Sequence, residues 1–170
     1  MERRVVVTGM GTVSPLGNDL PTTWAGVLEG RSGVAPITKF DTTGYRTTIA
    51  AEAKDFDPED YFNRKQARRL DPFVQFALVA TREAINDSGI SFDDDLAKRT
   101  AVIIGSGIGG ITTITEQAYV LKERGAGRIS PFLIPMILPE TAASMVAIEF
   151  GLKGPNMAMT SACATSANTI

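Results

Sequence analysis

The most informative stretch of the chain covers residues 154–168 and reads Gly154-Pro155-Asn156-Met157-Ala158-Met159-Thr160-Ser161-Ala162-Cys163-Ala164-Thr165-Ser166-Ala167-Asn168. Asn156 to Thr160 has no helix cap and alternates larger with smaller side chains, which predicts a short strand. Residues 161–167 are almost entirely small, as a sharp strand-to-helix turn requires where backbones approach closely. We therefore expect a strand–turn–helix unit with Cys163, the single cysteine of the chain, at its turn.

Cys163 is the candidate nucleophile of this unit. If a helix begins at or just after it, unpaired backbone N–H groups and the positive helix end point at the sulfur. Such a site favours the thiolate, and the same N–H groups can hold a developing oxyanion. A lone cysteine is, however, more often a small buried apolar side chain. On residue type alone, both interpretations stand.

Composition limits the class of protein. The 170 residues suit about one domain, and 44% hydrophobic with 21% charged residues is ordinary for a globular protein. A formal charge of −2 argues against nucleic-acid binding, and one cysteine excludes an internal disulfide. We expect a reducing compartment, the cytoplasm, and no membrane association, because neither a signal peptide nor a run of 18 apolar residues is present. Histidine is absent, so thiol chemistry that needs one must obtain it from outside these residues.

Hydrophobic periodicity and breakers predict an α/β protein. β-Branched runs predict buried strands at 4–8 and 100–104, and a weaker strand signal covers 47–51. Caps and glycines predict four helices, at about 19–28, 72–88, 112–124 and 140–150. Residues 31–46 are expected to form a loop, and three prolines prevent 130–139 from forming one regular helix. The acidic residues 93–95 predict an exposed turn, and no metal site is expected there.

Two glycine-rich stretches raise the question of a nucleotide cofactor. Residues 9–17 begin as Gly-x-Gly, but Ser14 replaces the third glycine of a dinucleotide fingerprint, and a turn is the better interpretation. Residues 105–110 read Gly-Ser-Gly-Ile-Gly-Gly and lack the lysine of a phosphate-binding loop. We interpret these glycines as positions where backbone or ligand approaches closely, and we expect no cofactor.

Four cations, Arg64, Lys65, Arg68 and Arg69, fall within six residues and are called here the basic ridge. On a helix, Arg64 and Arg68 lie one turn apart, as do Lys65 and Arg69. Alone, this spacing predicts an ordinary solvated face.

Four ordered blocks together resemble the β-ketoacyl-acyl carrier protein synthases, the elongating condensing enzymes of the thiolase fold, and most closely the type II synthase. The blocks are Val6–Gly11 with Pro15–Gly17, Gly105–Gly110, Ser130–Phe132, and Gly154-Pro155 with Cys163. The resemblance implies that residues 1–170 are the N-terminal β-ketoacyl synthase domain, the N-terminal portion of an α-β-α-β-α sandwich. Family members are well over twice this long and work as homodimers.

The resemblance also implies a function: decarboxylative Claisen condensation of an acyl thioester with malonyl-acyl carrier protein in fatty-acid elongation. Cys163 would carry the acyl group, and phosphopantetheine would arrive on the carrier protein. The two catalytic histidines would lie beyond Ile170, so the 170-residue chain alone is expected to be inactive. Ile108 and, across the dimer, Phe132 and Leu133 would line the acyl pocket.

The same resemblance assigns the basic ridge to docking of the acidic acyl carrier protein, with Lys65, Arg68 and Arg69 weighted above Arg64. Two alternatives remain open. The first is a polyketide-type ketosynthase with a different acyl preference. The second is a non-catalytic thiolase-fold dimerisation partner, although such partners usually lack the nucleophile that Cys163 would supply.

Overall fold

The computed structural model describes residues 4–170, and these divide into two compact units. The first unit combines the chain up to Asp57 with Val79–Gly89, and the second combines Pro58–Leu78 with Ile90–Ile170. Helix α3 (Pro72–Ser88) contributes residues to both units. No helix in the described part of the chain is long and apolar enough to cross a membrane.

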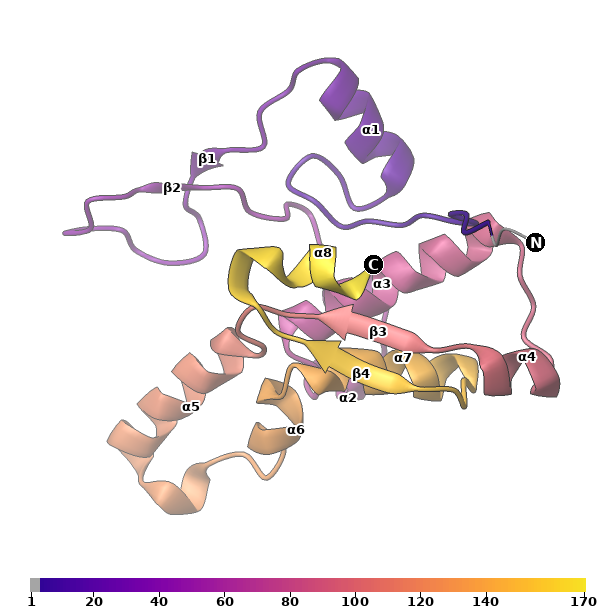
Figure 1. Ribbon diagram of the computed structural model, residues 1–170. Coiled ribbons are helices and arrows are strands. Elements are labelled where there is room, and N and C mark those ends of the chain that lie inside the picture. Colours follow the sequence, from indigo (N-terminus) through magenta and orange to yellow (C-terminus); the bar gives the residue numbers. More distant parts are fainter. Residues whose placement is uncertain (1–3) are drawn as a thin grey trace. The chain divides into compact units, whose positions relative to one another are not determined.

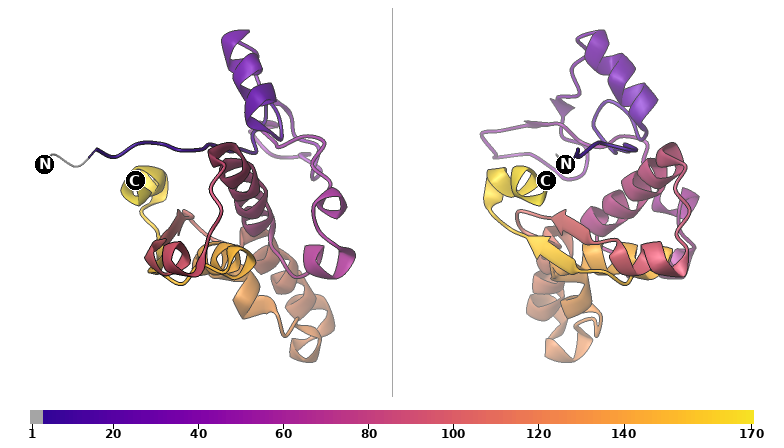
Figure 2. Two further views of the ribbon diagram at one scale, coloured as in Figure 1. Left: turned by 90° about the vertical axis from the view of Figure 1, so that its right-hand side faces the viewer. Right: turned by 45° about the vertical axis from the view of Figure 1, so that its right-hand side comes forward.

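A pair of parallel strands lies at the centre of the second unit. β3 (Val102–Gly105) pairs with β4 (Asn156–Met159), so that Val102 faces Asn156 and Gly105 faces Met159. Helix α7 (Glu140–Phe150) packs on both strands, and α8 (Thr165–Thr169) packs mainly on β3. Figures 1 and 2 show α7 and α8 on opposite sides of the strands. The second unit therefore has three layers, helix–strand–helix, as expected of an α/β protein.

Seven further elements complete the second unit. They are η1 (Pro58–Asp60), α2 (Arg64–Ala67), α4 (Asp94–Arg99), α5 (Ile111–Arg124), η2 (Ala126–Arg128), α6 (Leu133–Ile137) and η3 (Ala162–Ala164). The core gathers apolar side chains from α3, α7 and β3, among them Val74, Leu78, Ala142, Ala143, Val146 and Val102. Leu78 is 1% exposed, and burying a side chain of this size contributes about 1.5–3 kcal/mol.

In the first unit, an extended N-terminal segment runs along the C-terminal half of α3. The N–H of Met10 donates to Asp87 Oδ2 and the N–H of Thr12 donates to Glu83 Oε2, both at 2.9 Å. A Cβ added at Gly9 or Gly11 would lie about 2 Å from a carbonyl oxygen of α3, at 2.1 Å and 2.0 Å respectively. The Gly-x-Gly of this segment is thus explained by close packing of backbone on helix.

The predicted buried strand at 4–8 is wrong. This segment pairs with no other strand within residues 4–170, and Val5 is 97% exposed. β-Branched residues favour an extended backbone, but a strand also needs a neighbour that supplies hydrogen bonds.

The weaker strand prediction at 47–51 is confirmed in part, because β2 (Ile49–Ala50) pairs antiparallel with β1 (Ala35–Pro36). β1 lies within the stretch that was expected to be entirely loop.

The helices follow their sequence signals closely. α1 (Leu20–Leu28) has Asp19 as its N-cap, whose side chain accepts the N–H of Thr22. α5 and α7 are confirmed, and α7 ends at Gly151 with a φ of 64°, the left-handed conformation that favours glycine. The acidic residues 93–95 are a correction: Asp93 caps α4, so they form a helix start. α6 is a single short helix inside the proline-containing segment.

Candidate active site

Cys163 lies on the predicted strand–turn–helix unit. β4 ends at Met159, the 3₁₀ turn η3 contains the cysteine, and α8 begins at Thr165. Ala162, directly before the cysteine, has a φ of 49°, a left-handed conformation that is uncommon for a residue other than glycine. The Cys163 side chain is exposed, which contradicts the interpretation of this residue as a small buried apolar side chain.

Two polar side chains of α8 hold the turn in place. Thr165 is buried, and its Oγ1 accepts the N–H of Ser161 at 2.9 Å and donates to the carbonyl of Ala162 at 2.8 Å. Asn168 Nδ2 donates to Ser161 Oγ at 2.6 Å. These bonds fix the backbone on the N-terminal side of Cys163, where the left-handed residue lies, and leave the sulfur accessible.

The glycine-rich loop that follows β3 lies against this turn. A Cβ added at Gly105 would come within 2.1 Å of Thr165 Cγ2, so only glycine permits this approach of β3 and α8. A Cβ at Gly107 would lie 3.8 Å from the carbonyl oxygen of Ala162, an ordinary contact. The N–H of Ser106 donates to Met159 O at 3.2 Å and extends the parallel ladder into the loop. The expectation that these glycines mark a close backbone approach is confirmed.

The predicted pocket residues occupy two different places. Ile108 belongs to the glycine-rich loop, next to the residue that contacts the cysteine turn, and is 65% exposed. Phe132 is the N-cap of α6, and Leu133 is its first residue. Phe132 is 38% exposed, and Leu133 is partly buried.

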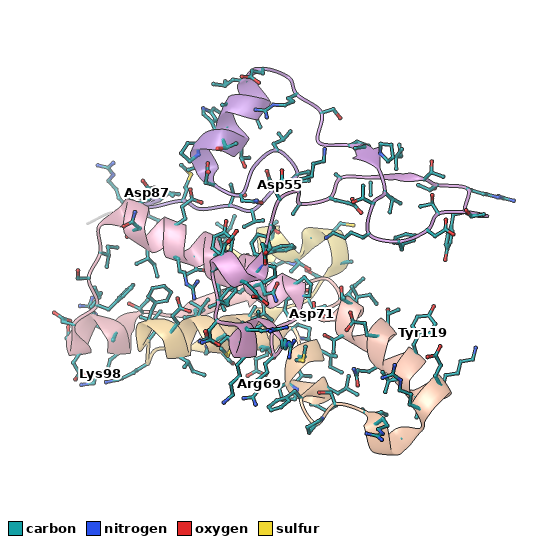
Figure 3. The ribbon with its side chains drawn as sticks, turned by 180° about the vertical axis from the view of Figure 1, so that it is seen from behind. Asp55, Arg69, Asp71, Asp87, Lys98 and Tyr119 are labelled. Atoms are coloured by element: carbon teal, nitrogen blue, oxygen red, sulfur yellow. The ribbon has the colours of Figure 1, made fainter. Side chains whose placement is uncertain are left out.

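One cation of the basic ridge contacts one of these pocket residues. The guanidinium carbon of Arg69 lies 4.2 Å from the centroid of the Phe132 ring, a cation–π contact. The structure therefore joins a residue predicted to bind the carrier protein to a residue predicted to bind the acyl group. Arg69 is labelled in Figure 3.

The four cations of the basic ridge share one surface hollow. They line a volume of about 410 Å³, although α2 ends at Ala67 and the ridge is less helical than its spacing predicts. Arg64 lies 3.7 Å from Glu59 Oε1. Within residues 4–170, no carboxylate forms an ion pair with Lys65, Arg68 or Arg69. Three of the four charges thus stay available to an external anion.

Sequence reasoning missed two buried polar residues that shape the site. Thr165 lies in the stretch 154–168, but no local sequence pattern indicates that its hydroxyl braces the turn. The pair Asp71-Pro72 is typical of a helix start and α3 does begin there, but the sequence does not indicate that the Asp71 carboxylate also accepts the N–H and the hydroxyl of Thr113 on α5. Within the described residues, no group of three or more histidine, cysteine, aspartate or glutamate side chains could hold a metal ion.

Comparisons with known proteins identify the family. Residues 2–170 match the family model described as "Beta-ketoacyl synthase, N-terminal domain". The 3-oxoacyl-[acyl-carrier-protein] synthase 2 of Staphylococcus aureus is 47% identical over 168 residues, which are 99% of this chain and 41% of that protein. The synthase 2 of Synechocystis sp. is 42% identical over 169 residues, with the same coverage. The chain thus spans about two fifths of the length of these relatives.

Solved structures agree with this fold. The ishigamide ketosynthase/chain length factor has a TM-score of 0.82 and 31% identity, and covers 94% of this chain and 40% of its own. A β-ketoacyl synthase from Burkholderia phymatum has a TM-score of 0.79 and 26% identity, and covers 98% of this chain and 41% of its own. The fold, the exposed cysteine on its braced turn and the family model agree, and the chain belongs to the β-ketoacyl synthase family.

Proposed function

We propose that the protein is a 3-oxoacyl-acyl carrier protein synthase that elongates fatty acids through an acyl-Cys163 intermediate. The observation that carries this proposal is the exposed thiol on a braced, left-handed turn in a chain 47% identical to such a synthase. The synthases named above act with an acyl carrier protein by name, which supports the same partner here.

The first half-reaction belongs to the residues of this chain. The Cys163 thiolate attacks the carbonyl carbon of the acyl thioester, and the carbonyl oxygen becomes an oxyanion. When this intermediate collapses, the bond to the phosphopantetheine sulfur breaks, and that sulfur leaves as a thiolate and takes up a proton. The product is a thioester between the acyl group and Cys163. We assign the stabilisation of this oxyanion to backbone N–H groups at the turn.

The second half-reaction needs groups that these residues do not supply. Malonyl-carrier protein loses carbon dioxide, the resulting carbanion attacks the acyl-Cys163 carbonyl, and the cysteine leaves as a thiolate. The 170 residues contain no histidine, so we assign the stabilisation of the carbanion to residues outside them. Ile108, Phe132 and Leu133 are proposed to line the acyl pocket, the last two across a homodimer. The basic ridge is proposed to dock the carrier protein.

Intact-protein mass spectrometry of the full-length synthase tests the proposal. Incubation with acyl-carrier protein should add the mass of one acyl group to the wild type and none to Cys163→Ala. Ser166→Ala is the matched control, because it removes an exposed hydroxyl three residues away and should leave the adduct intact. An adduct that survives in Cys163→Ala would disprove the assignment. The 170-residue chain alone should form no 3-oxoacyl product.

A second candidate function is that of a polyketide-type ketosynthase. It is supported by the structural likeness to the ishigamide ketosynthase/chain length factor, which is 31% identical to this chain. A comparison of kcat/KM for a saturated acyl-carrier protein and for a 3-oxoacyl-carrier protein separates the two candidates. Preference for the saturated substrate supports fatty-acid elongation, whereas preference for the 3-oxo substrate supports the alternative. A non-catalytic role is disfavoured by the presence and exposure of Cys163.

A further inference from the structure

Asp71 is a buried carboxylate that connects two separate parts of the second unit. It is 2% exposed, and its Oδ2 accepts the backbone N–H of Thr113 at 2.9 Å and the hydroxyl of Thr113 at 2.7 Å. The two residues are 42 positions apart, and Thr113 is itself 3% exposed. Within residues 4–170, no lysine or arginine forms an ion pair with Asp71. The two hydrogen bonds from Thr113 satisfy Oδ2, and Oδ1 accepts the N–H of Phe73 at 3.4 Å, so the buried carboxylate has donors from the starts of both α5 and α3.

Asp71 replaces a cap that α5 cannot provide for itself. The N-cap of this helix is Gly110, which has no side chain to accept an N–H of the first turn. The glycine is also required by the space that the carboxylate and α6 occupy. A Cβ at position 110 would lie 3.1 Å from Asp71 Oδ2 and 2.3 Å from the carbonyl oxygen of Met136. The arrangement is thus built around a carboxylate that arrives from α3.

Asp71 follows the basic ridge closely along the chain. It lies two residues after Arg69, at the start of α3 (Figure 3). One helical turn later, the buried Gln75 donates from Nε2 to the carbonyl of Ala67 at 3.0 Å and to that of Leu70 at 2.9 Å. The end of the ridge is therefore fixed to the same turn of α3 that carries Asp71.

Asp71 also fixes the helix that follows the glycine-rich loop. Within this loop, the N–H of Gly109 donates to Ser106 Oγ at 2.9 Å, and the N–H of Gly110 donates to Ile137 O at 3.0 Å. Ile108 lies between Ser106 and Gly109, the two residues that the first of these bonds joins. The position of the Ile108 side chain therefore depends on where α5 begins, and Asp71 holds that beginning.

We propose that Asp71 is a positioning residue that fixes the start of α5, and with it the loop carrying Ile108, relative to the end of the basic ridge. The proposal rests on the proposed function, in which the ridge binds the carrier protein and Ile108 contacts the acyl chain. Loosening the bond between Asp71 and Thr113 lets the start of α5 move, so that Ile108 discriminates less sharply between acyl chains of different length. The charge of the docking surface does not change, so recognition of the carrier protein is unaffected.

The test compares Thr113→Val and Thr113→Ser in the full-length synthase. Valine keeps the shape and the N–H but removes the hydroxyl, whereas serine keeps both donors. We expect amide hydrogens of residues 111–114 to exchange about tenfold faster in Thr113→Val, because the free energy lost with one buried hydrogen bond corresponds to about that factor. With free acyl-pantetheine thioesters, the ratio of kcat/KM between a long and a medium acyl chain should change at least threefold. Thr113→Ser should match the wild type in both measurements.

Asp93→Asn is the matched control for Asp71→Asn, because Asp93 caps α4 through the N–H of Leu96 and has no link to the loop. Of these two aspartate variants, only Asp71→Asn should speed the exchange of amide hydrogens at residues 111–114. Unchanged exchange in both Asp71→Asn and Thr113→Val would show that Asp71 does not hold the start of α5, and would overturn the proposal. Faster exchange with an unaltered acyl-chain ratio would overturn the positioning role. A wild type that cannot condense would instead disprove the proposed function, while the exchange measurement would still decide whether Asp71 holds α5.

Discussion

Replacing Thr165 with valine should weaken the turn that carries Cys163 while preserving its shape. Valine is close to threonine in size but lacks Oγ1, which bonds to the N–H of Ser161 at 2.9 Å and to the carbonyl of Ala162 at 2.8 Å. A neutral hydrogen bond contributes about 0.5–1.5 kcal/mol net, so the two together contribute about 1–3 kcal/mol. Thr165 is 5% exposed, so water has little access to replace the lost hydroxyl.

The loss falls on a backbone that is already strained. The left-handed conformation of Ala162, with a φ of 49°, costs roughly 1–2 kcal/mol relative to an ordinary backbone. Without the hydroxyl of Thr165, the turn can relax and displace Cys163. If the free energy of both hydrogen bonds is lost from the turn geometry that reacts, transfer of the acyl group to Cys163 should slow by roughly 5- to 150-fold.

A time course of acyl-enzyme formation, followed by intact-protein mass spectrometry of the full-length synthase, measures this rate. Thr165→Ser is the control, because it keeps the hydroxyl and loses only the methyl group that packs at Gly105. It should acylate close to the wild-type rate even if its thermal stability falls. Acylation of Thr165→Val within twofold of the wild type, or equal slowing of both variants, would refute the reasoning.

Three further predictions concern the docking surface, the pocket and the pH dependence of stability. Lys65→Glu with Arg68→Glu, which spares the stack of Arg69 on Phe132, should raise KM for acyl-carrier protein and flatten its salt dependence. Activity with a free acyl-pantetheine thioester should hardly change; an equal loss on both substrates would mean that the ridge supports the fold. Ile108→Phe should shorten the longest acyl chain accepted, because each buried carbon contributes about 0.8 kcal/mol only where it fits, and an unchanged chain-length profile would place Ile108 outside the pocket. Hydrogen bonds from Lys153 and Lys98 hold the pKa of Asp94 below its ordinary value of 3.8. The ionised Asp94 therefore stabilises the folded state at neutral pH, and this contribution is lost as the pH falls below about 4. Asp94→Asn should abolish that part of the pH dependence of the unfolding midpoint, and identical acid profiles would argue against it.

Elements whose signals are local could be predicted from the sequence. α7 is predicted at about 140–150 and occupies Glu140–Phe150, and the left-handed Gly151 marks its C-terminal end. β4 and the turn at Cys163 were likewise readable, since small residues follow an alternating apolar run. In each case, neighbouring residues along the chain supply the physical cause.

Features that depend on distant partners could not be predicted in this way. The run at residues 4–8 has the composition of a strand, but composition does not state whether a neighbouring strand exists. Asp71 has the sequence context of a helix start, yet its carboxylate caps α5 rather than α3 alone. The glycine at position 105 is explained by its contact with Thr165, which lies 60 residues later along the chain.

The candidate site shows the same division. Position in the chain and small neighbours singled out Cys163, while the basic ridge was visible only as a charged face. The assignment of Ile108, Phe132 and Leu133 to an acyl pocket is a prediction from the family resemblance and from no pattern in this sequence. The contact between Arg69 and Phe132 followed from neither source, because it joins segments that only folding brings together.

The arrangement around Cys163 resolves two demands that oppose each other. A nucleophile must be accessible to a bulky thioester, but it must also be held in one geometry if proximity is to accelerate the reaction. Burial would fix the cysteine at the expense of access, and here the cysteine is exposed while Thr165, two residues later, is buried. Thr165 holds the carbonyl of Ala162 by a hydrogen bond, and this bond fixes the backbone that carries Cys163. Substitutions that loosen Thr165 should therefore reduce the rate of acyl transfer more than they reduce the accessibility of the thiol to a small alkylating reagent.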